Sequence, residues 1–314
     1  MQDIFLGKIT GSLLMLAAAF SFLSLGQKSG CSTSHAAIKQ DTGIIADGAT
    51  PQLVSRQFIF TEGPAVDRQG NVFFTDQPNN RIWKYDTGGN LSLFMDSAGR
   101  SNGMHFDKKG NLLTCADKEN QLWSISPSRK ITVLLNDVEG KKLNGPNDLW
   151  VAPNGDIYFT DPYYQRRYWQ RTAPEMEGQW VYLLRKGSSK AVPLLKNLEQ
   201  PNGIVGTPDG KTLYVADLKG GKTYRYAIQK DGLLGEAQLF ASIGSDGMTI
   251  DNRGNVYLTG QGVKVFTKGG DQIIHIPLPG WTANVVFGGT NRDELFITAS
   301  EAVYTLKMKV RGVQ

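Results

Sequence analysis

A unit that recurs six times along the chain constrains its fold more than any other feature of the sequence. Each copy has a short apolar strand, a turn built on glycine, and a second strand of alternating apolar residues that often ends in Thr-Asp or Ala-Asp. The copies lie at 65–76, 106–117, 151–161, 207–217, 250–259 and, in degenerate form, around 291–298. One or two further strands follow each copy, and the turn glycines recur roughly every 40 to 55 residues, which is the length of a four-stranded blade.

Six such blades predict an all-β fold, a six-bladed β-propeller around a central channel, whose closed ring protects the strand edges. The length of 314 residues alone would also allow two domains, so the repeat decides. We assign residues 51–314 to one propeller domain and expect residues 51–60 to complete the ring by pairing with the last blade.

The N-terminal region reads as a leader. Residues 13–25 are apolar except for two serines and follow Lys8, which suits the core of a signal peptide and is too short to span a bilayer. We therefore assign residues 1–36 to a signal peptide or lipoprotein leader and 37–50 to a linker. The mature protein is expected to be exported, to the periplasm or the extracellular space.

Two cleavage points remain open. Cleavage after Ala36 would release a free protein, whereas cleavage before Cys31 would leave a lipid anchor, although Lys28 stands where a lipobox has an apolar residue. Either way only Cys115 remains inside the mature chain, which excludes a disulfide framework, and we expect it to be a small buried residue in a strand.

The repeated aspartates favour a structural interpretation. The Asp-x-x-Gly-Asn turns resemble calcium loops, but each is short and lies between two antiparallel strands, where glycine supplies the positive φ of a hairpin. The aspartates that end the second strands occur in most blades, so we expect them to serve the blade rather than one site: Asp76, Asp117, Asp161 and Asp217.

The blades differ just before their first strands, where a polar residue stands among small neighbours. Because the first strand of a blade is the innermost, these positions should meet at one mouth of the channel. They are Glu62, Asn102, Asn147 with Asp148, Asn202, Asp246 and Asn284. The alternative is that Asn-Gly and Asp-Gly pairs are only turn formers, but this does not account for Glu62.

A ring of carboxylate and amide oxygens suits a hard divalent cation, most readily Ca²⁺. The chain has only three histidines and two cysteines, which excludes a zinc site built from Cys and His ligands. The net charge is only +5, without a long basic run, so nucleic acid is not an expected partner.

From about residue 55 to the end, the chain resembles the senescence marker protein, regucalcin and gluconolactonase family. The motifs that carry the resemblance are Thr61-Glu62-Gly63-Pro64, Leu143-Asn144-Gly145-Pro146-Asn147-Asp148-Leu149, Phe159-Thr160-Asp161-Pro162, Pro201-Asn202-Gly203-Ile204 and Ser245-Asp246-Gly247-Met248. The resemblance implies a six-bladed propeller with one catalytic divalent ion in the channel. The positions that match its ligands are Glu62, Asn147, Asn202 and Asp246.

The chain departs from this family at two points. Vertebrate members have a substrate-contacting arginine two residues before the asparagine that matches Asn147, and this chain has Gly145 at that position. The related fluorophosphatase uses an aspartate for a second calcium where this chain has Thr249, so that second ion is not predicted. Some bacterial lactonases hold a different second calcium beside the motif that contains Asn147. Three residues of this chain are therefore candidates for such a site: Glu139, Asn144 and Asp148.

The resemblance implies metal-dependent hydrolysis of a sugar lactone or a related lactone, in the manner of a gluconolactonase. We expect Asp246 to act as the base for water, with direct nucleophilic attack by Asp246 as an alternative. Asn102 is expected to bind a substrate hydroxyl, and Asp148 to orient a neighbour beside the substrate. A metal-dependent phosphoesterase of the organophosphate hydrolase type and a non-catalytic ligand-binding propeller are the rival functions.

The third blade carries an insertion of about 20 residues between Asp161 and Trp180. In an up-and-down blade the loop after the second strand lies on the same face as Glu62 and Asp246. We therefore expect the insertion to overhang the site, where its aromatic residues, Tyr163 among them, could stack on a sugar ring. Its three arginines, Arg166 among them, could attract a carboxylate or a phosphate. A surface loop packed by its own aromatic residues is the alternative.

Overall fold

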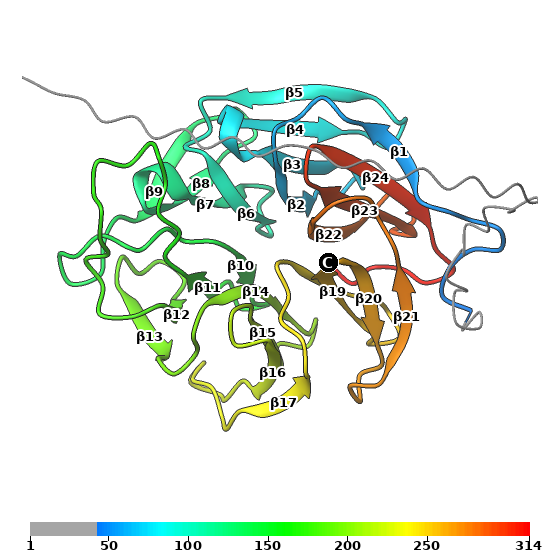
Figure 1. Cartoon of the computed structure of the whole chain (residues 1–314). Helices are drawn as coiled ribbons and strands as arrows, with labels where there is room; N and C mark the ends of the chain where they lie inside the picture. The colour runs from blue at the N-terminus through cyan, green and yellow to red at the C-terminus, as the bar shows by residue number, and fades with distance from the viewer. Residues whose placement is uncertain (1–42) are drawn as a thin grey trace, which may run out of the picture. The chain divides into compact units, whose positions relative to one another are not determined.

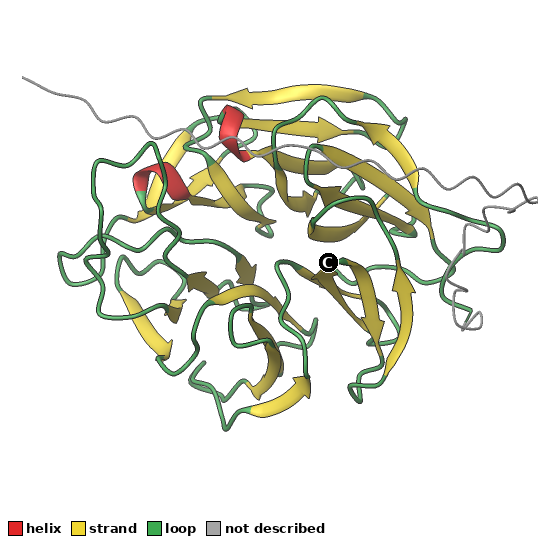
Figure 2. Ribbon diagram, in the orientation of Figure 1, coloured by secondary structure: helices red, strands yellow, loops and turns green. Residues whose placement is uncertain are grey.

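The computed structural model describes residues 43–314 and confirms the expected six-bladed β-propeller (Figure 1, Figure 2). The described strands form six sheets of four antiparallel strands each. In chain order, the first blade consists of β2 Thr61–Val66, β3 Val72–Asp76, β4 Arg81–Tyr85 and β5 Leu91–Asp96, and the second of β6 Ser101–Phe106, β7 Leu112–Ala116, β8 Gln121–Ile125 and β9 Ile131–Leu135. The third blade consists of β10 Leu149–Val151, β11 Ile157–Asp161, β12 Trp180–Leu184 and β13 Ala191–Leu195, and the fourth of β14 Pro201–Gly206, β15 Thr212–Asp217, β16 Lys222–Ala227 and β17 Gln238–Ala241. The fifth blade consists of β18 Met248–Ile250, β19 Val256–Gly260, β20 Gly262–Phe266 and β21 Gln272–Ile276, and the sixth of β22 Thr282–Gly288, β23 Glu294–Ala299 and β24 Ala302–Lys307 with β1 Gln52–Ser55.

The ring closes as the sequence predicts. Strand β1 pairs antiparallel with β24 and supplies the outer strand of the last blade. Residues just before β1 continue this edge, because the Lys309 amide donates to the Ile44 carbonyl and Ile45 forms a bridge with Met308. The expected leader at 1–36, with Cys31, lies outside the described residues.

The first strand of each blade lies innermost, and the first strands of successive blades contact one another around the ring: β2 with β6 and β22, β10 with β6 and β14, and β18 with β14 and β22. The hydrophobic core lies between the blades as a series of apolar clusters. The inner strands of each blade contribute to it, because they bury residues on both faces. Cys115 is buried in β7, as expected. None of the helices described is long and apolar enough to cross a membrane.

The strand-end aspartates fasten the chain that enters their own blade, in three of the four cases. Asp76 accepts from the amides of residues 59 and 60, and Asp217 accepts from those of residues 199 and 200. Asp161 does the same with Asn144 and Gly145. These contacts confirm the structural interpretation for three aspartates, whereas Asp117 makes different contacts that belong to the site.

Candidate active site

The polar residues that precede or begin the inner strands meet in one cavity of about 260 Å³. Glu62 lies in β2, Asn102 in β6 and Asn202 in β14, whereas Asn147 and Asp246 lie in the turns that lead into β10 and β18. The remaining lining residues are Phe60, Gln77, Tyr164, Arg166, Leu218 and Trp281. Five of the residues in the predicted ring thus lie together, whereas Asp148 and Asn284 do not line the cavity.

A glycine follows four of the ring residues, Glu62, Asn102, Asn202 and Asp246, and it has a packing role. A Cβ at Gly63 would lie 1.9 Å from the carbonyl oxygen of Asn102, and a Cβ at Gly247 would lie 2.0 Å from the Asn284 side chain. Only glycine lets neighbouring inner segments approach this closely. Close packing between neighbouring inner strands therefore explains why glycine follows these residues. The sequence alone could also be interpreted as a set of turns.

Glu62 is a buried carboxyl that forms no ion pair with a basic side chain among residues 43–314. One of its oxygens accepts from the Gly63 amide and, at 3.2 Å, from Asn284 Nδ2. Burial, followed by the negative charge of Asp246, raises the pKa of Glu62 well above its usual range. Asn284 therefore supports Glu62 and does not itself line the cavity.

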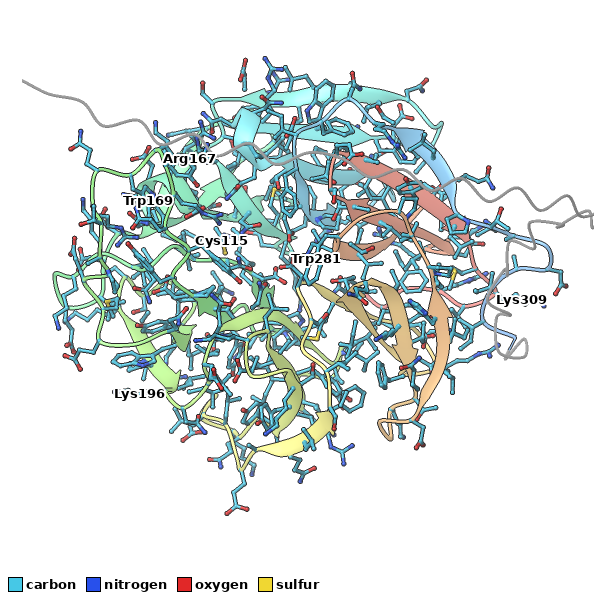
Figure 3. All side chains as sticks on the ribbon, in the orientation of Figure 1. Cys115, Arg167, Trp169, Lys196, Trp281 and Lys309 are labelled. Carbon is cyan, nitrogen blue, oxygen red and sulfur yellow. The ribbon has the colours of Figure 1, made fainter. Side chains whose placement is uncertain are left out.

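Asp246 is the second carboxyl that faces the cavity. Its Oδ2 accepts a 2.5 Å hydrogen bond from the indole Nε1 of Trp281, the residue just before β22. Burial raises the pKa of Asp246 to about 6, although the bond from Trp281 acts in the opposite direction. Figure 3 shows Trp281 beside the central opening of the ring.

Asp148 lies beneath this pair and does not line the cavity. Its Oδ1 accepts from the Leu149 amide at 2.9 Å, and burial raises its pKa to about 7. Asp148 thus has the position of a supporting residue, consistent with the expectation that it orients a neighbour, and it does not contact the space where substrate would bind.

Two amide oxygens in the cavity wall have no hydrogen-bond donor within the part of the chain that the structure describes. Asn102 Oδ1 and Asn202 Oδ1 are buried and unpartnered, although Asn202 Nδ2 donates to the Tyr164 hydroxyl at 3.0 Å. The unpaired Asn202 oxygen, beside buried carboxyls with raised pKa values, fits a bound cation, whereas the unpaired Asn102 oxygen fits a hydrogen-bond donor such as a substrate hydroxyl.

This oxygen set differs from a cluster of acidic or sulfur ligands. Within residues 43–314, no three His, Cys, Asp or Glu side chains are grouped so as to hold one ion. A cation here would depend on Glu62 and Asp246 for charge and on the oxygens of Asn147 and Asn202 for the rest of its shell. Hard divalent ions accept such mixed shells.

The insertion of the third blade reaches the cavity, as expected. It connects the end of β11 at Asp161 to the start of β12 at Trp180. Tyr164 and Arg166 line the cavity. Tyr163, the expected stacking residue, instead contacts the Trp169 ring at 5.9 Å and the Arg171 guanidinium at 5.4 Å. We name residues 162–179 the lid.

Asp117 fastens this lid to the second blade. Its Oδ2 accepts from Arg166 Nε at 2.8 Å, from the Tyr168 hydroxyl at 2.7 Å and from Gln77 Nε2 at 2.8 Å. Its carboxyl is 1% exposed and Arg166 is 24% exposed, so this is a buried, hydrogen-bonded ion pair. Asp117 therefore differs from the other strand-end aspartates, because it holds a segment that reaches the cavity.

Gly145 lies beneath the lid, and its surroundings explain why the arginine of the vertebrate proteins is absent. A Cβ at residue 145 would lie 2.7 Å from Asp117 Oδ1 and 2.9 Å from the Trp169 ring, and the φ of +147° also favours glycine. The lid thus occupies the space into which a longer side chain at residue 145 would extend. Arg166 brings a guanidinium to the cavity from the other side.

The three candidates for a second ion do not form a common cluster. Glu139 is exposed. Asn144 Nδ2 donates to the carbonyls of Asp161 and Gly178, and Asp148 lies beneath the cavity. The contacts of Asn144 are those of a residue that fixes the base of the lid.

Five of the lining residues were not predicted from the sequence, and one of them is Phe60, which directly precedes β2. Gln77 and Leu218 each follow the aspartate that ends the second strand of a blade, so the rule that places the lid on this face also places them there. Tyr164 is adjacent to the residue chosen, and its direction depends on the lid conformation. Trp281 stands three residues before Asn284, and no sequence signal singles it out.

Known proteins resemble this chain over most of its length. A gluconolactonase of Zymomonas mobilis is 27% identical over 301 residues, which cover 85% of this chain and 84% of that protein. A Staphylococcus aureus lactonase is 27% identical over 270 residues, which cover 80% of each protein.

Solved structures agree with the fold. A gluconolactonase of Xanthomonas campestris superposes with a TM-score of 0.79 at 29% identity, covering 85% of this chain and 91% of the other. A regucalcin of Agrobacterium tumefaciens has the same fold, with a TM-score of 0.70 at 20% identity and a coverage of 84% and 95%. The profile described as the SMP-30/Gluconolactonase/LRE-like region matches residues 60–301. The chain belongs to this family of six-bladed propellers.

Proposed function

We propose that the protein hydrolyses a sugar lactone or a related lactone to the hydroxy acid, with a divalent cation, most readily Ca²⁺, in the cavity. Relatives named gluconolactonase and lactonase support the reaction class. The observation that carries the proposal is that the carboxyls of Glu62 and Asp246 line the same cavity as Asn102 and Asn202, whose side-chain oxygens are unpaired.

When bound, the cation would supply a Lewis acid that polarises the lactone carbonyl. Glu62, Asn147, Asn202 and Asp246 would hold it. Asp246 would take a proton from water, and the bond from Trp281, which fixes one of its carboxylate oxygens, supports this role. A pKa of about 6 lets this carboxylate remain a base at neutral pH.

The remaining lining residues would position the substrate. The cavity of about 260 Å³ suits a single-ring lactone rather than one that carries a long chain. Arg166 is already paired with Asp117, so we infer that its remaining N–H groups donate to neutral hydroxyls more readily than they bind a carboxylate. Asn102 offers an amide group to the same substrate.

The test compares purified protein before and after chelation, with metal content measured by elemental analysis. Glucono-δ-lactone is the first substrate, and a dialkyl aryl phosphate tests the phosphoesterase alternative. We expect lactone hydrolysis that disappears with the metal and returns with CaCl2. Hydrolysis that persists in protein shown to be free of metal would refute the metal-dependent mechanism.

Two other results would redirect the proposal. Turnover of the phosphate ester alone would favour the phosphoesterase, and metal-dependent binding of lactones without turnover would favour a binding protein. Export is part of the same proposal, and it rests on the apolar residues 13–25. Terminal sequencing of the mature protein tests it, since an intact Met1 in the cytosolic fraction would contradict export.

A further inference from the structure

A second and larger cavity, of about 740 Å³, lies at the seam between the second and third blades. The residues around it belong to the turn between β6 and β7, the turn between β10 and β11, and the hairpin between β12 and β13. These turns connect the opposite ends of the inner strands from the ring of site residues. The groove therefore lies on the other face of the propeller and shares no lining residue with the candidate active site.

The neighbouring seam, between the first and second blades, is filled by larger side chains. Three phenylalanines meet there: the ring of Phe73 lies 4.9 Å from that of Phe94 and 5.1 Å from that of Phe106. The cavity that remains beside them is about 420 Å³.

At the seam between the second and third blades, the equivalent positions carry smaller side chains. Leu113 is the second residue of β7, where β3 has Phe73. Leu134 is the residue of β9 without a partner at the register shift between β8 and β9, and Phe94 has the same position in β5. Val151 is the last residue of β10, where β6 has Phe106. The larger groove thus follows from the loss of three aromatic rings at matched positions. Leu113, Leu134 and Val151 line the groove.

The rim of the groove is basic. Its lining includes Lys108, Lys109, Arg185 and Lys186 but only one acidic residue, Asp107. The cavity at the neighbouring seam has two basic and two acidic lining residues in contrast: Arg68 and Lys109, with Asp67 and Asp107.

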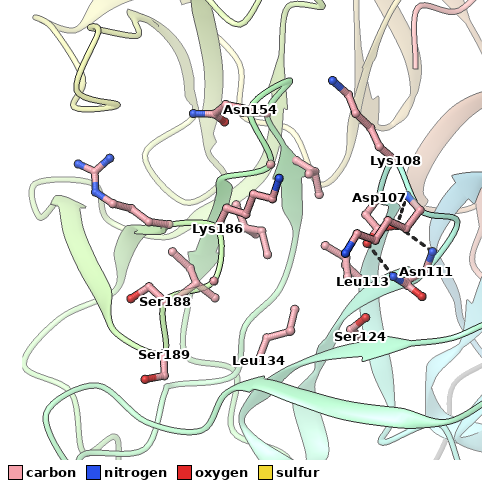
Figure 4. A pocket seen from close by; sticks show the side chains of 18 of the residues that line it. Asp107, Lys108, Asn111, Leu113, Ser124, Leu134, Asn154, Lys186, Ser188 and Ser189 are labelled. Atoms are coloured by element: carbon pink, nitrogen blue, oxygen red, sulfur yellow. Dashed lines mark hydrogen bonds between the residues drawn. The ribbon is translucent and has the colours of Figure 1, made fainter.

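Two of the rim cations are available for a ligand. Lys108 Nζ already donates to the Pro153 carbonyl at 2.7 Å, and Arg185 interacts with Asp156. Within the described residues, neither Lys109 nor Lys186 has a carboxylate within 4.0 Å of its ammonium group. Figure 4 shows Lys186 across the groove from Asp107 and Asn111, with Leu134 and Ser124 at one end.

We propose that this groove is a second binding site, which takes an amphiphilic carboxylate such as a medium-chain fatty acid. The alkyl chain would lie on Leu113, Leu134 and Val151, and the carboxylate would lie between Lys109 and Lys186. The volume is within the range of small-molecule sites, and an apolar floor with a few convergent charges is their usual composition. The proposal does not depend on the lactonase function.

Decanoate is the probe, and its binding is measured by displacement of 8-anilinonaphthalene-1-sulfonate fluorescence from the full chain. Decanol, which has the same chain without the charge, is the matched ligand control. We expect decanoate to bind at least about 5-fold more tightly than decanol, because only its carboxylate can pair with the two exposed ammonium groups. Equal binding of the two would overturn the proposed role of the rim.

The variants test the floor and the rim separately. Leu113→Phe/Leu134→Phe/Val151→Phe copies the neighbouring seam and should weaken decanoate at least about 10-fold. If this triple variant does not fold, Leu134→Phe alone, at a partly exposed position, should still weaken it measurably. Unchanged affinity in a folded variant would refute the site.

For the rim, Lys109→Gln/Lys186→Gln should remove most of the preference for decanoate over decanol. Lys264→Gln/Lys268→Gln, on the fifth blade, is the matched charge control and should preserve that preference. Lactone turnover is measured in parallel and should be unchanged in all these variants. A dimer that the triple variant dissolves would instead assign the groove to a second copy of the chain.

Discussion

Trp281 Nε1 and Asp246 Oδ2 form a 2.5 Å hydrogen bond at the edge of the cavity. The bond joins the segment before β22 to the segment before β18, two adjacent blades. It orients the one carboxyl to which we assign proton transfer, and it favours the ionised form of that carboxyl. The indole therefore acts on the reaction through Asp246 rather than through contact with a reacting atom.

Replacing this donor should change the pH dependence of the reaction. In Trp281→Phe the ionised form of Asp246 loses a hydrogen bond, so its pKa should rise and the acidic limb of the kcat profile should move to higher pH. We expect a shift of about 0.5 to 1 pH unit, comparable to the net value of one hydrogen bond. Trp83→Phe is the control, because the Trp83 Nε1 atom has no partner in the described structure. A pH profile that coincides with that of the parent would contradict the positioning role.

The two carboxyls of the cavity should fail in different ways. Asp246→Asn should retain the fold and lower kcat by about 10² to 10⁴, the usual contribution of a general base. Glu62→Gln should first weaken cation binding, so that added CaCl2 restores part of the activity. Calcium titrations of kcat separate the two effects. If saturating CaCl2 restored Asp246→Asn as fully as Glu62→Gln, the assignment of a proton acceptor to Asp246 would fail.

The raised pKa values of Glu62, Asp148 and Asp246 predict how the cation changes stability with pH. In cation-free protein these carboxyls bind protons more tightly when folded than when unfolded. Their contribution is therefore complete below the unfolded pKa values and is lost as the pH rises through about 6 to 7. A cation would stabilise the ionised forms, so CaCl2 should raise Tm more at about pH 8 than at about pH 5.

Calorimetry of chelated and reloaded protein at both pH values measures this effect. The double variant Glu62→Gln/Asp246→Asn should lose most of the pH-dependent gain. An equal gain at both pH values in the parent would mean that the cation binds elsewhere.

Repetition made the fold predictable, whereas the details of the site depend on contacts between blades. Each of the six copies shows the same order of strands and turns, so the boundaries of one blade can be checked against the others. The positions of Glu62 and Asp246 near the start of the inner strands therefore follow from the sequence. The roles of Trp281 and Asp117 do not follow, because each contacts a residue of another blade. Asp117 resembles Asp76 in the sequence and differs only in its spatial neighbours.

The lid gives the last prediction. Asp117→Asn keeps the shape of the side chain but removes the charge that Arg166 and Tyr168 share, so the lid should lose its attachment while the propeller remains folded. Because Tyr164 and Arg166 would then line the cavity less often, we expect KM for glucono-δ-lactone to rise about 5- to 20-fold with a smaller change in kcat.

Arg167→Gln is the matched control, since Arg167 is exposed on the same lid, beside Trp169 in Figure 3. A cycle with Arg166→Gln tests the coupling: if Asp117 acts through Arg166, the double variant should be little worse than either single variant. Independent, additive effects on KM would show instead that Asp117 only supports the blade.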